Sequence, residues 1–170
     1  MNNAQNDFLK LVVPAAQSAM RKFGVPASIT AAQAILESGW GMSALARQCY
    51  NFFGIKAVAS AQPGSYQEFQ TAEFVQGRRV AELARFARYP DPASGFEAHA
   101  LLLATAVRYR PFMAACQARD LGWACRELYV CGYSTNPSYP KLLGELREEF
   151  DLEQYDIWPT PPAQAAEAVA

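Results

Sequence analysis

The first half of the chain carries apolar residues at the three- and four-residue spacing that is typical of α-helices. We expect residues 1–6 to form a loose N-terminus, Asp7 to cap a first helix and Gly24 to end it. Pro14 is the one residue that disagrees with a continuous helix in this stretch. The apolar positions of the helix are Phe8, Leu11, Val12, Ala15, Ala19 and Phe23.

A second helix is expected after Pro26 and Ser28, with its apolar positions on one face. It should stop at Gly39 and Gly41, because two closely spaced glycines break helical continuity. A short third helix is expected over 44–49, after a serine that can cap it. The apolar face of the second helix is formed by Ile29, Ala32, Ile35 and Leu36.

Residues 68–86 follow a different pattern, in which neighbouring positions alternate between polar and apolar. Gln76 and Gly77 supply a turn in the middle of this stretch, so the pattern predicts a small hairpin of two or three strands. Such a hairpin is too small to be stable by itself. We therefore expect it to pack against the helices.

Helical periodicity returns after the hairpin. The final residues, 159–170, contain three prolines and one charge, and we expect them to form a disordered tail. The pattern as a whole predicts one domain over 7–158. This domain is mainly α-helical, with a small β-hairpin lobe inserted about halfway along it. The later helices are expected over 94–109, 120–131 and 138–150.

The composition excludes several classes of function. Hydrophobic residues make up 51% of the chain, which is enough to form a core, and the net charge of −1 gives no basic surface for nucleic acid. No apolar run approaches the roughly 20 residues that a membrane-spanning helix needs. His99 is the single histidine, which excludes His-rich zinc sites and argues against a histidine-based triad. We expect no metal and no cofactor.

The N-terminal residues and the cysteines bear on where the protein works. The first residues lack the basic and apolar segments of a secretory signal, so we expect a protein made in the cytoplasm without a signal peptide. The four cysteines contain no C-x-x-C pair, which argues against zinc and against a thioredoxin-type motif. Buried free thiols and one or two disulfides both fit the pattern, which involves Cys49, Cys116, Cys125 and Cys131.

Glu37 is the first candidate for chemistry. It lies in the last turn of a predicted helix, where the helix dipole disfavours a carboxylate. Trp40 follows three residues later, and an aromatic wall beside a carboxyl group raises its pKa toward neutrality, as a general acid requires. From these two residues alone, a solvated glutamate beside a core tryptophan is the more ordinary interpretation.

A longer stretch changes that balance. The residues from Ser28 to Ala57, SITAAQAILESGWGMSALARQCYNFFGIKA, resemble the signature of glycoside hydrolase family 73. These are the lysozyme-like N-acetylglucosaminidases of bacterial cell walls, and they include the hydrolase domain of the flagellar rod-cap protein. The resemblance spans about residues 8–157 and implies a lysozyme-like fold. Further similar blocks follow in family order at 71–74, 86–89, 99–103 and 132–139.

The resemblance implies three catalytic residues. Glu37 corresponds to the general acid, Glu73 to a second carboxylate on the β-lobe, and Tyr139 to a tyrosine at the cleft. Carboxylates about 6.5–9.5 Å apart suit an inverting route through an activated water, and about 5–5.5 Å suits a direct nucleophile. In a third route the substrate's own N-acetyl oxygen attacks. The sequence leaves these three routes open.

The resemblance also implies residues that contact the substrate. Trp40, Asn51, Phe52 and Lys56 are expected to line or brace the groove, and Tyr133 to contribute a phenol. Aromatic rings mixed with amides suit a sugar, which has an apolar face and a rim of hydroxyls. His99 is expected to support the fold through a hydrogen bond. One departure is Asn136, which stands where an aspartate is common.

The implied function is hydrolysis of the β-1,4 bond between N-acetylglucosamine and N-acetylmuramic acid in peptidoglycan, in the periplasm or cell wall. Without a signal peptide, we expect an antibacterial toxin injected by a type VI-like secretion system and matched by an immunity protein that occludes the cleft. A phage endolysin of the same activity is the alternative. A glycan-binding module without catalysis is the alternative from another class. The expected partners exclude nucleic acid and membrane insertion.

Overall fold

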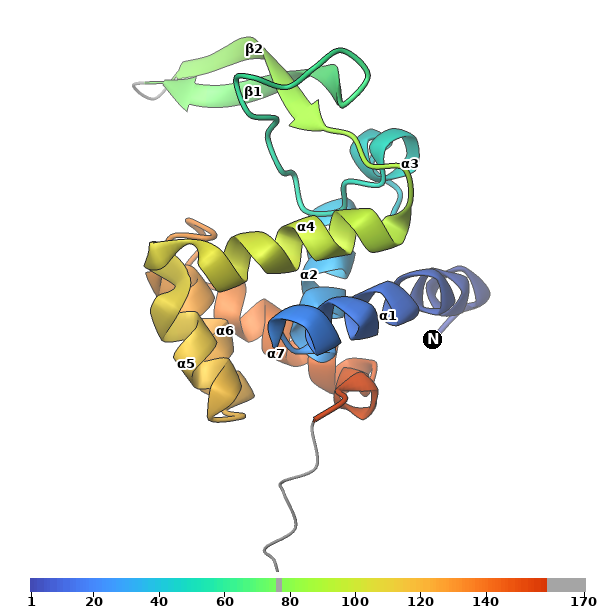
Figure 1. Cartoon of the computed structure of the whole chain (residues 1–170), viewed down its shortest axis with the longest axis vertical. Helices are drawn as coiled ribbons and strands as arrows, with labels where there is room; N and C mark the ends of the chain where they lie inside the picture. The colour runs from blue at the N-terminus through green and yellow to red at the C-terminus, as the bar shows by residue number, and fades with distance from the viewer. Residues whose placement is uncertain (76–77, 159–170) are drawn as a thin grey trace, which may run out of the picture.

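The computed structural model describes residues 1–75 and 78–158, except for the side chains at 72–81. Figure 1 shows a helical body from which a two-stranded hairpin projects, with α3 near its base and α4 running across the body below it. The expected mainly α-helical architecture with a small β-lobe is confirmed. The helices are α1 (Asn3–Phe23), α2 (Ala27–Ser38), α3 (Ala44–Cys49), α4 (Pro92–Thr105), α5 (Arg110–Gln117), α6 (Leu121–Val130) and α7 (Tyr139–Glu149), with 3₁₀ helices η1 (Val107–Tyr109) and η2 (Leu152–Tyr155).

The first helix begins earlier than the sequence pattern predicted. The Asn2 side chain accepts a hydrogen bond from the Gln5 backbone N–H at 2.9 Å, and the Gln5 side chain accepts one from the Asn2 N–H at 2.8 Å. This reciprocal capping box satisfies two backbone donors that the helix itself leaves unpaired. The expectation of a loose segment over 1–6, capped at Asp7, is therefore wrong. Pro14 lies inside α1, which continues through it.

Helix α2 is the central element of the helical body. Ten of its twelve residues are buried, and it packs against α1, α7 and η2. The sequence pattern predicted one apolar face, but small residues around the whole helix let neighbours approach from several sides. Its N-terminus is capped from the far end of the chain, because the Asp156 carboxylate accepts from the Ser28 N–H at 2.8 Å and from the Ser28 hydroxyl at 2.7 Å.

The helix expected over 94–109 is shorter in the structure, and a further helix follows it. Helix α4 ends at Thr105, where Ala106 takes an extended conformation, and η1 then leads into α5. Helix α5 was missed in the sequence, although Pro111 near its start is a signal for a helix N-terminus. Its buried residues Phe112, Ala115 and Cys116 have helical spacing.

The β-lobe consists of β1 (Tyr66–Val75) and β2 (Arg78–Ala87), paired antiparallel. The segment before it adds a short third edge: the Ala57 N–H donates to the Arg85 carbonyl and the Ala87 N–H to the Ile55 carbonyl, both at 2.9 Å. The hairpin is thus paired with the body-side loop as well as with itself. The turn predicted at residues 76–77 and the disordered tail predicted over 159–170 lie outside the described residues.

The four cysteines are free thiols in the described structure, and three of them are buried. This arrangement corresponds to the first of the two cysteine states that the sequence left open. No helix within 1–75 or 78–158 combines the length and the apolar character that crossing a bilayer requires.

Gly95 generates a prediction about how α4 sits against the loop after α3. A Cβ atom at Gly95 would lie 2.2 Å from the Tyr50 carbonyl oxygen, so backbone would have to move. We expect Gly95→Ala to lower the free energy of unfolding by about 1–3 kcal/mol, as overpacking does. Urea unfolding followed by circular dichroism measures the change.

Gly144→Ala is the matched control, because Gly144 also lies within a helix but a Cβ atom there would have no neighbour within 4 Å. Alanine has the higher helix propensity, so this variant should be more stable by about 0.5–1 kcal/mol. Equal effects of the two substitutions would contradict the close approach at Gly95.

Candidate active site

Glu37 lies in the last turn of α2, and its side chain is exposed although most of the helix is buried. The chain reverses directly after it, because Gly39, Trp40 and Gly41 all have left-handed backbone conformations, with φ of 57°, 59° and 73°. The Ser38 hydroxyl steadies this turn by accepting from the Gly41 N–H at 2.7 Å. The result is a carboxyl group presented at the end of a rigid helix.

Tyr139 is the residue that contacts Glu37 most directly. It is the first residue of α7 and is 2% exposed, and hydrogen bonding by its hydroxyl lowers the pKa of the Glu37 carboxyl. The Gln33 amide donates to the same hydroxyl, with 3.1 Å between Nε2 and the phenol oxygen. Because Gln33 and Glu37 are four residues apart on α2, both lie on the face that meets α7.

A block of rings stands behind this contact. The Tyr133 ring stacks on Tyr139 at 5.7 Å between centroids, and its hydroxyl lies 3.1 Å from His99 Nε2. His99 in turn stacks on Phe53 at 3.8 Å, and Tyr109 packs on Tyr133 at 6.3 Å. The hydrogen bond of His99 agrees with the structural role expected for it. Tyr133 and Tyr139, distant in the sequence from Glu37, are thus brought to it.

The surroundings of Glu37 favour its protonated form. Desolvation raises the pKa of the Glu37 carboxyl above its ordinary value, and the hydrogen bond from Tyr139 partly opposes this shift. Burial also raises the pKa of both Tyr133 and Tyr139, so their phenols stay neutral and can donate hydrogen bonds. A carboxyl group that holds its proton toward neutral pH is suited to general acid catalysis.

Trp40, which was expected beside Glu37, makes its described ring contacts with two phenylalanines. Its ring packs edge-to-face on Phe8 at 5.8 Å and on Phe150 at 4.8 Å, between α1 and the end of α7. The left-handed backbone at Trp40 directs the side chain there. The aromatic neighbours of Glu37 in the structure are instead Tyr139 and Tyr133.

Two residues expected near the substrate are buried. Asn51 is 1% exposed, and its amide donates to the carbonyls of Ile55 and Ala87, both at 2.9 Å, while its oxygen accepts from the Ile55 N–H. Phe52 is 3% exposed and packs among other phenylalanines. Their polar atoms and ring surfaces are engaged within the fold, which agrees with the bracing role rather than the lining role that was expected of them. Lys56 is exposed and pairs through its backbone with Phe86.

Glu73 lies in β1, where its backbone pairs in register with Val80 near the free end of the hairpin. Its side chain belongs to the part that the structure does not describe, so its role stays a prediction. Asn136, the departure from the family pattern, accepts from the Ser138 N–H at 2.9 Å just before α7. An aspartate would form the same turn, so the amide preserves this local role.

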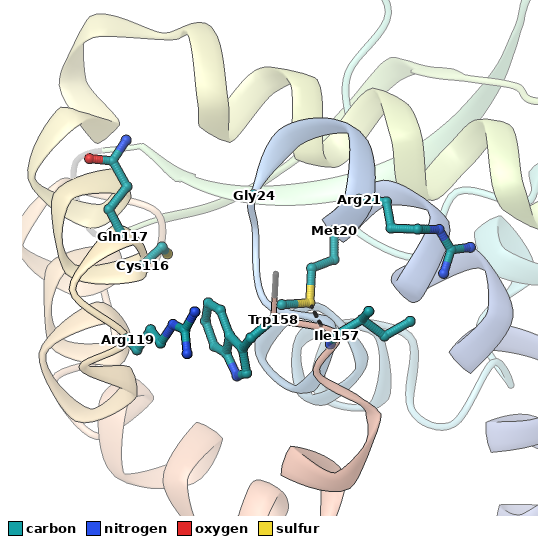
Figure 2. Close-up of a pocket in the computed structure, with 8 residues that line it drawn as sticks. All are labelled: Met20, Arg21, Gly24, Cys116, Gln117, Arg119, Ile157 and Trp158. Carbon is teal, nitrogen blue, oxygen red and sulfur yellow. Dashed lines mark hydrogen bonds between the residues drawn. The ribbon is translucent and has the colours of Figure 1, made fainter. Parts of the chain in front are cut away.

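The cavity drawn in Figure 2 lies elsewhere. It has a volume of about 480 Å³ and is lined by the ends of α1 and α5 and by residues 157–158, with the Arg119 side chain beside the Trp158 ring. None of the predicted site residues lines it. In the part of the chain that is described, no group of three acidic, cysteine or histidine side chains could hold a metal ion.

The helical body, the inserted β-lobe and an acidic side chain at the end of a buried helix define a glycoside hydrolase of the lysozyme-like class. Residues 13–152 match the glucosaminidase family, described as mannosyl-glycoprotein endo-beta-N-acetylglucosaminidase. The chain belongs to this family.

Relatives and solved structures agree with the assignment. Exo-glucosaminidase LytG of Bacillus subtilis is 32% identical, covering 89% of this chain and 54% of LytG. Peptidoglycan hydrolase FlgJ of Pseudomonas aeruginosa is 31% identical, covering 88% of this chain and 38% of FlgJ. The chain thus spans about half or less of these relatives. The catalytic domain of the Listeria monocytogenes autolysin Auto has a TM-score of 0.81 at 27% identity, covering 92% of this chain and 89% of that domain.

A type VI secretion effector–immunity complex from Pseudomonas protegens has a TM-score of 0.58 at 18% identity, covering 90% of this chain and 96% of that chain. At this identity the likeness shows the fold alone.

Gln33 and Tyr109 are site residues whose contacts the sequence analysis missed. For Gln33 a signal was present, because a polar side chain four residues before Glu37 shares its helix face. Tyr109 offered no such signal, because only the packing of η1 against the loop after α6 brings its ring to Tyr133.

The buried His99 gives a prediction about pH. Burial lowers the pKa of its imidazole to about 3 in the folded protein. In the unfolded chain the imidazole is protonated below about pH 6.5, whereas in the folded protein it stays neutral until the pH falls toward 3. The contribution of His99 to the free energy of unfolding is therefore fully present above pH 6.5 and is lost as the pH falls toward 3. Between pH 7.5 and 5 the loss should be about 2 kcal/mol.

Because His99 is the single histidine, proton NMR of its ring reports on it directly. We expect no titration above pH 5 in the folded protein, and a titration near pH 6.5 would contradict the prediction. The stability difference between wild type and His99→Gln, measured by urea unfolding at both pH values, isolates the histidine contribution from that of the carboxylates.

Tyr139→Phe gives a second prediction at this site. Because the hydrogen bond from Tyr139 lowers the pKa of Glu37, removing the hydroxyl should raise that pKa further. Carboxyl ¹³C NMR of Glu37 across a pH titration measures the change. Tyr133→Phe is the control, since that hydroxyl bonds His99 and its loss should leave the Glu37 titration near that of wild type.

Proposed function

We propose that this chain is a peptidoglycan hydrolase that cleaves the β-1,4 bond on the reducing side of N-acetylglucosamine. The observation that carries the proposal is Glu37, an exposed carboxyl with a raised pKa at the end of a buried helix, in a chain of the glucosaminidase family. The names of LytG and FlgJ, an exo-glucosaminidase and a peptidoglycan hydrolase, support the substrate class.

In the proposed reaction Glu37 protonates the glycosidic oxygen as the bond to the anomeric carbon breaks. Glu73, on the projecting hairpin, is the second carboxylate and acts as base, as nucleophile or as an aid to the substrate's N-acetyl group. Each route ends with water adding to the anomeric carbon. These roles rest on the correspondence with the family.

Tyr139 orients the Glu37 carboxyl in this proposal, and its neighbour Tyr133 completes the wall on that side. Lys56 is exposed at the base of the β-lobe, where it would contact the glycan. Trp40 supports the turn after Glu37 through its contacts with Phe8 and Phe150.

The biological setting is a finer proposal. Peptidoglycan lies outside the cytoplasmic membrane, so the chain acts in the periplasm or cell wall, as an effector injected into a competing cell and blocked by an immunity protein. The occurrence of the fold in a solved effector–immunity complex supports this setting. A neighbouring gene whose periplasmic product binds this chain and stops hydrolysis would support the effector role. Its absence, together with a neighbouring holin gene, would favour a phage endolysin.

Glu37→Gln tests the enzymatic proposal. Purified peptidoglycan is incubated with wild type or variant, reduced with borohydride and analysed by mass spectrometry. Loss of the general acid should slow fragment release by about 10²–10⁴-fold. Wild-type fragments should end in reduced N-acetylglucosamine. Fragments ending in reduced N-acetylmuramic acid would move the cut to the neighbouring bond, and equal digestion by both proteins would overturn the role of Glu37.

Stability serves as the control for folding. The raised pKa of Glu37 means that its ionised form destabilises the folded state as the pH rises through that pKa. Glu37→Gln should therefore be at least as stable as wild type at pH 7, and its advantage should shrink toward pH 4. If neither protein releases fragments and both bind the glycan, the chain is a binding module.

A further inference from the structure

Gln33 is an unusual residue for the centre of a buried helix. Its side chain is fully buried, in the middle of α2, and its neighbours along the helix are alanines. Burying an amide costs free energy unless its hydrogen bonds are replaced. The Gln33 amide makes one described bond, from Nε2 to the Tyr139 hydroxyl, and Oε1 finds no partner among the described residues. Stability alone is a poor reason for a glutamine here.

The bond that Gln33 makes restricts the Tyr139 hydroxyl. A phenol has one proton to donate and lone pairs that accept. When the Gln33 N–H occupies the accepting side, the hydroxyl proton must point to another acceptor, and the Glu37 carboxyl is the acceptor that the structure places beside it. Donation by Gln33 also polarises the phenol and strengthens the bond that it donates in turn.

The direction of this chain of bonds depends on the residue at position 33. An acceptor there would draw the Tyr139 proton inward, and the Glu37 carboxylate would lose its donor. An apolar residue would free the phenol oxygen to accept from a protonated Glu37. In both cases the balance moves toward the protonated carboxyl, because a carboxylate is stabilised only while a donor faces it.

We propose that Gln33 is a positioning residue, whose buried amide donor directs the Tyr139 O–H toward the Glu37 carboxyl and thereby sets the pH range of the acid. The proposal rests on the function proposed above only for its effect on catalysis. The direction of the hydrogen bonds is a property of the folded chain and can be tested separately.

The titratable groups that face Glu37 in the described part of the chain are two phenols, Tyr139 from α7 and Tyr133 from the loop before it. Both stay neutral around pH 7, because burial raises the pKa of each. His99, behind Tyr133, is also neutral there. A neutral substitution at Gln33, such as Gln33→Met, therefore acts on Glu37 through hydrogen bonding and not through a displaced charge.

Two substitutions separate loss of the donor from reversal of the bond. Gln33→Met keeps the length and volume of the side chain and removes the donor. Gln33→Glu keeps the shape, and when ionised it presents oxygens that accept the Tyr139 proton and adds a negative charge one turn before Glu37. Thr30→Val is the matched control. Thr30 is also fully buried on α2, about one turn before Gln33, and its hydroxyl donates to the Pro26 carbonyl and not to Tyr139.

The first measurement is the titration of the Glu37 carboxyl by ¹³C NMR in the full chain. We expect Gln33→Met and Gln33→Glu each to raise the midpoint by about 0.5 pH units or more, whereas Thr30→Val leaves it unchanged. In a Tyr139→Phe background the Gln33→Met shift should disappear, because the effect runs through that hydroxyl. An unchanged midpoint in Gln33→Met, or a Gln33→Met shift that persists without the hydroxyl, would overturn the proposal.

The second measurement is the pH profile of kcat/KM for peptidoglycan digestion. Because the acid must be protonated, its alkaline limb should move upward with the Glu37 midpoint in Gln33→Met, while Thr30→Val loses stability without moving the limb. A lower kcat/KM at every pH with an unmoved limb would assign Gln33 a structural role only. If wild type digests no peptidoglycan, the proposed function fails, and the NMR titration still decides the role of Gln33.

Discussion

Helix α2 is enclosed by α1, α7 and the C-terminal segment, and this enclosure constrains the rest of the structure. A helix buried on all sides has no water to satisfy its polar groups, so other elements must do so. Asp156 caps its first turn from near the C-terminal end of the domain, and Tyr139 meets Gln33 in its middle. Both contacts tie the last part of the chain to α2, and the second one brings Tyr139 to Glu37.

The site follows from a balance at the end of this helix. Packing around α2 desolvates the Glu37 carboxyl and raises its pKa, while the Tyr139 hydroxyl stabilises the ionised form and limits the rise. A general acid needs such a compromise, since it must hold a proton and then release it. The left-handed turn after Glu37 ends the helix, so that the carboxyl is exposed there. The same turn directs the Trp40 ring into contact with Phe8 and Phe150.

The aromatic block behind the site shows why the single histidine is not the acid. His99 is fully buried between Phe53 and Tyr133, and because its pKa is lowered to about 3, its ring is uncharged near neutral pH. It contributes shape and one hydrogen bond to Tyr133. Two sets of contacts attach the β-lobe to the body: the backbone of Lys56 pairs with Phe86, and the buried amide of Asn51 bonds the carbonyls of Ile55 and Ala87.

The sequence by itself determined the helical class and the hairpin, because these depend on the local patterns of apolar spacing and alternation. Glu37 became the candidate acid only through the family resemblance, since its local surroundings alone favoured an ordinary solvated glutamate. The sequence misplaced the start of α1, merged α4 with η1 and missed α5, where short capping and proline signals compete with periodicity. Only the tertiary structure decided that α2 is buried along most of its length, that Asn51 and Phe52 are buried, and that Tyr139 meets both Gln33 and Glu37. The physical reason is that burial and hydrogen-bond partnership depend on residues 106 or 128 positions apart, and no local pattern encodes which of them will meet.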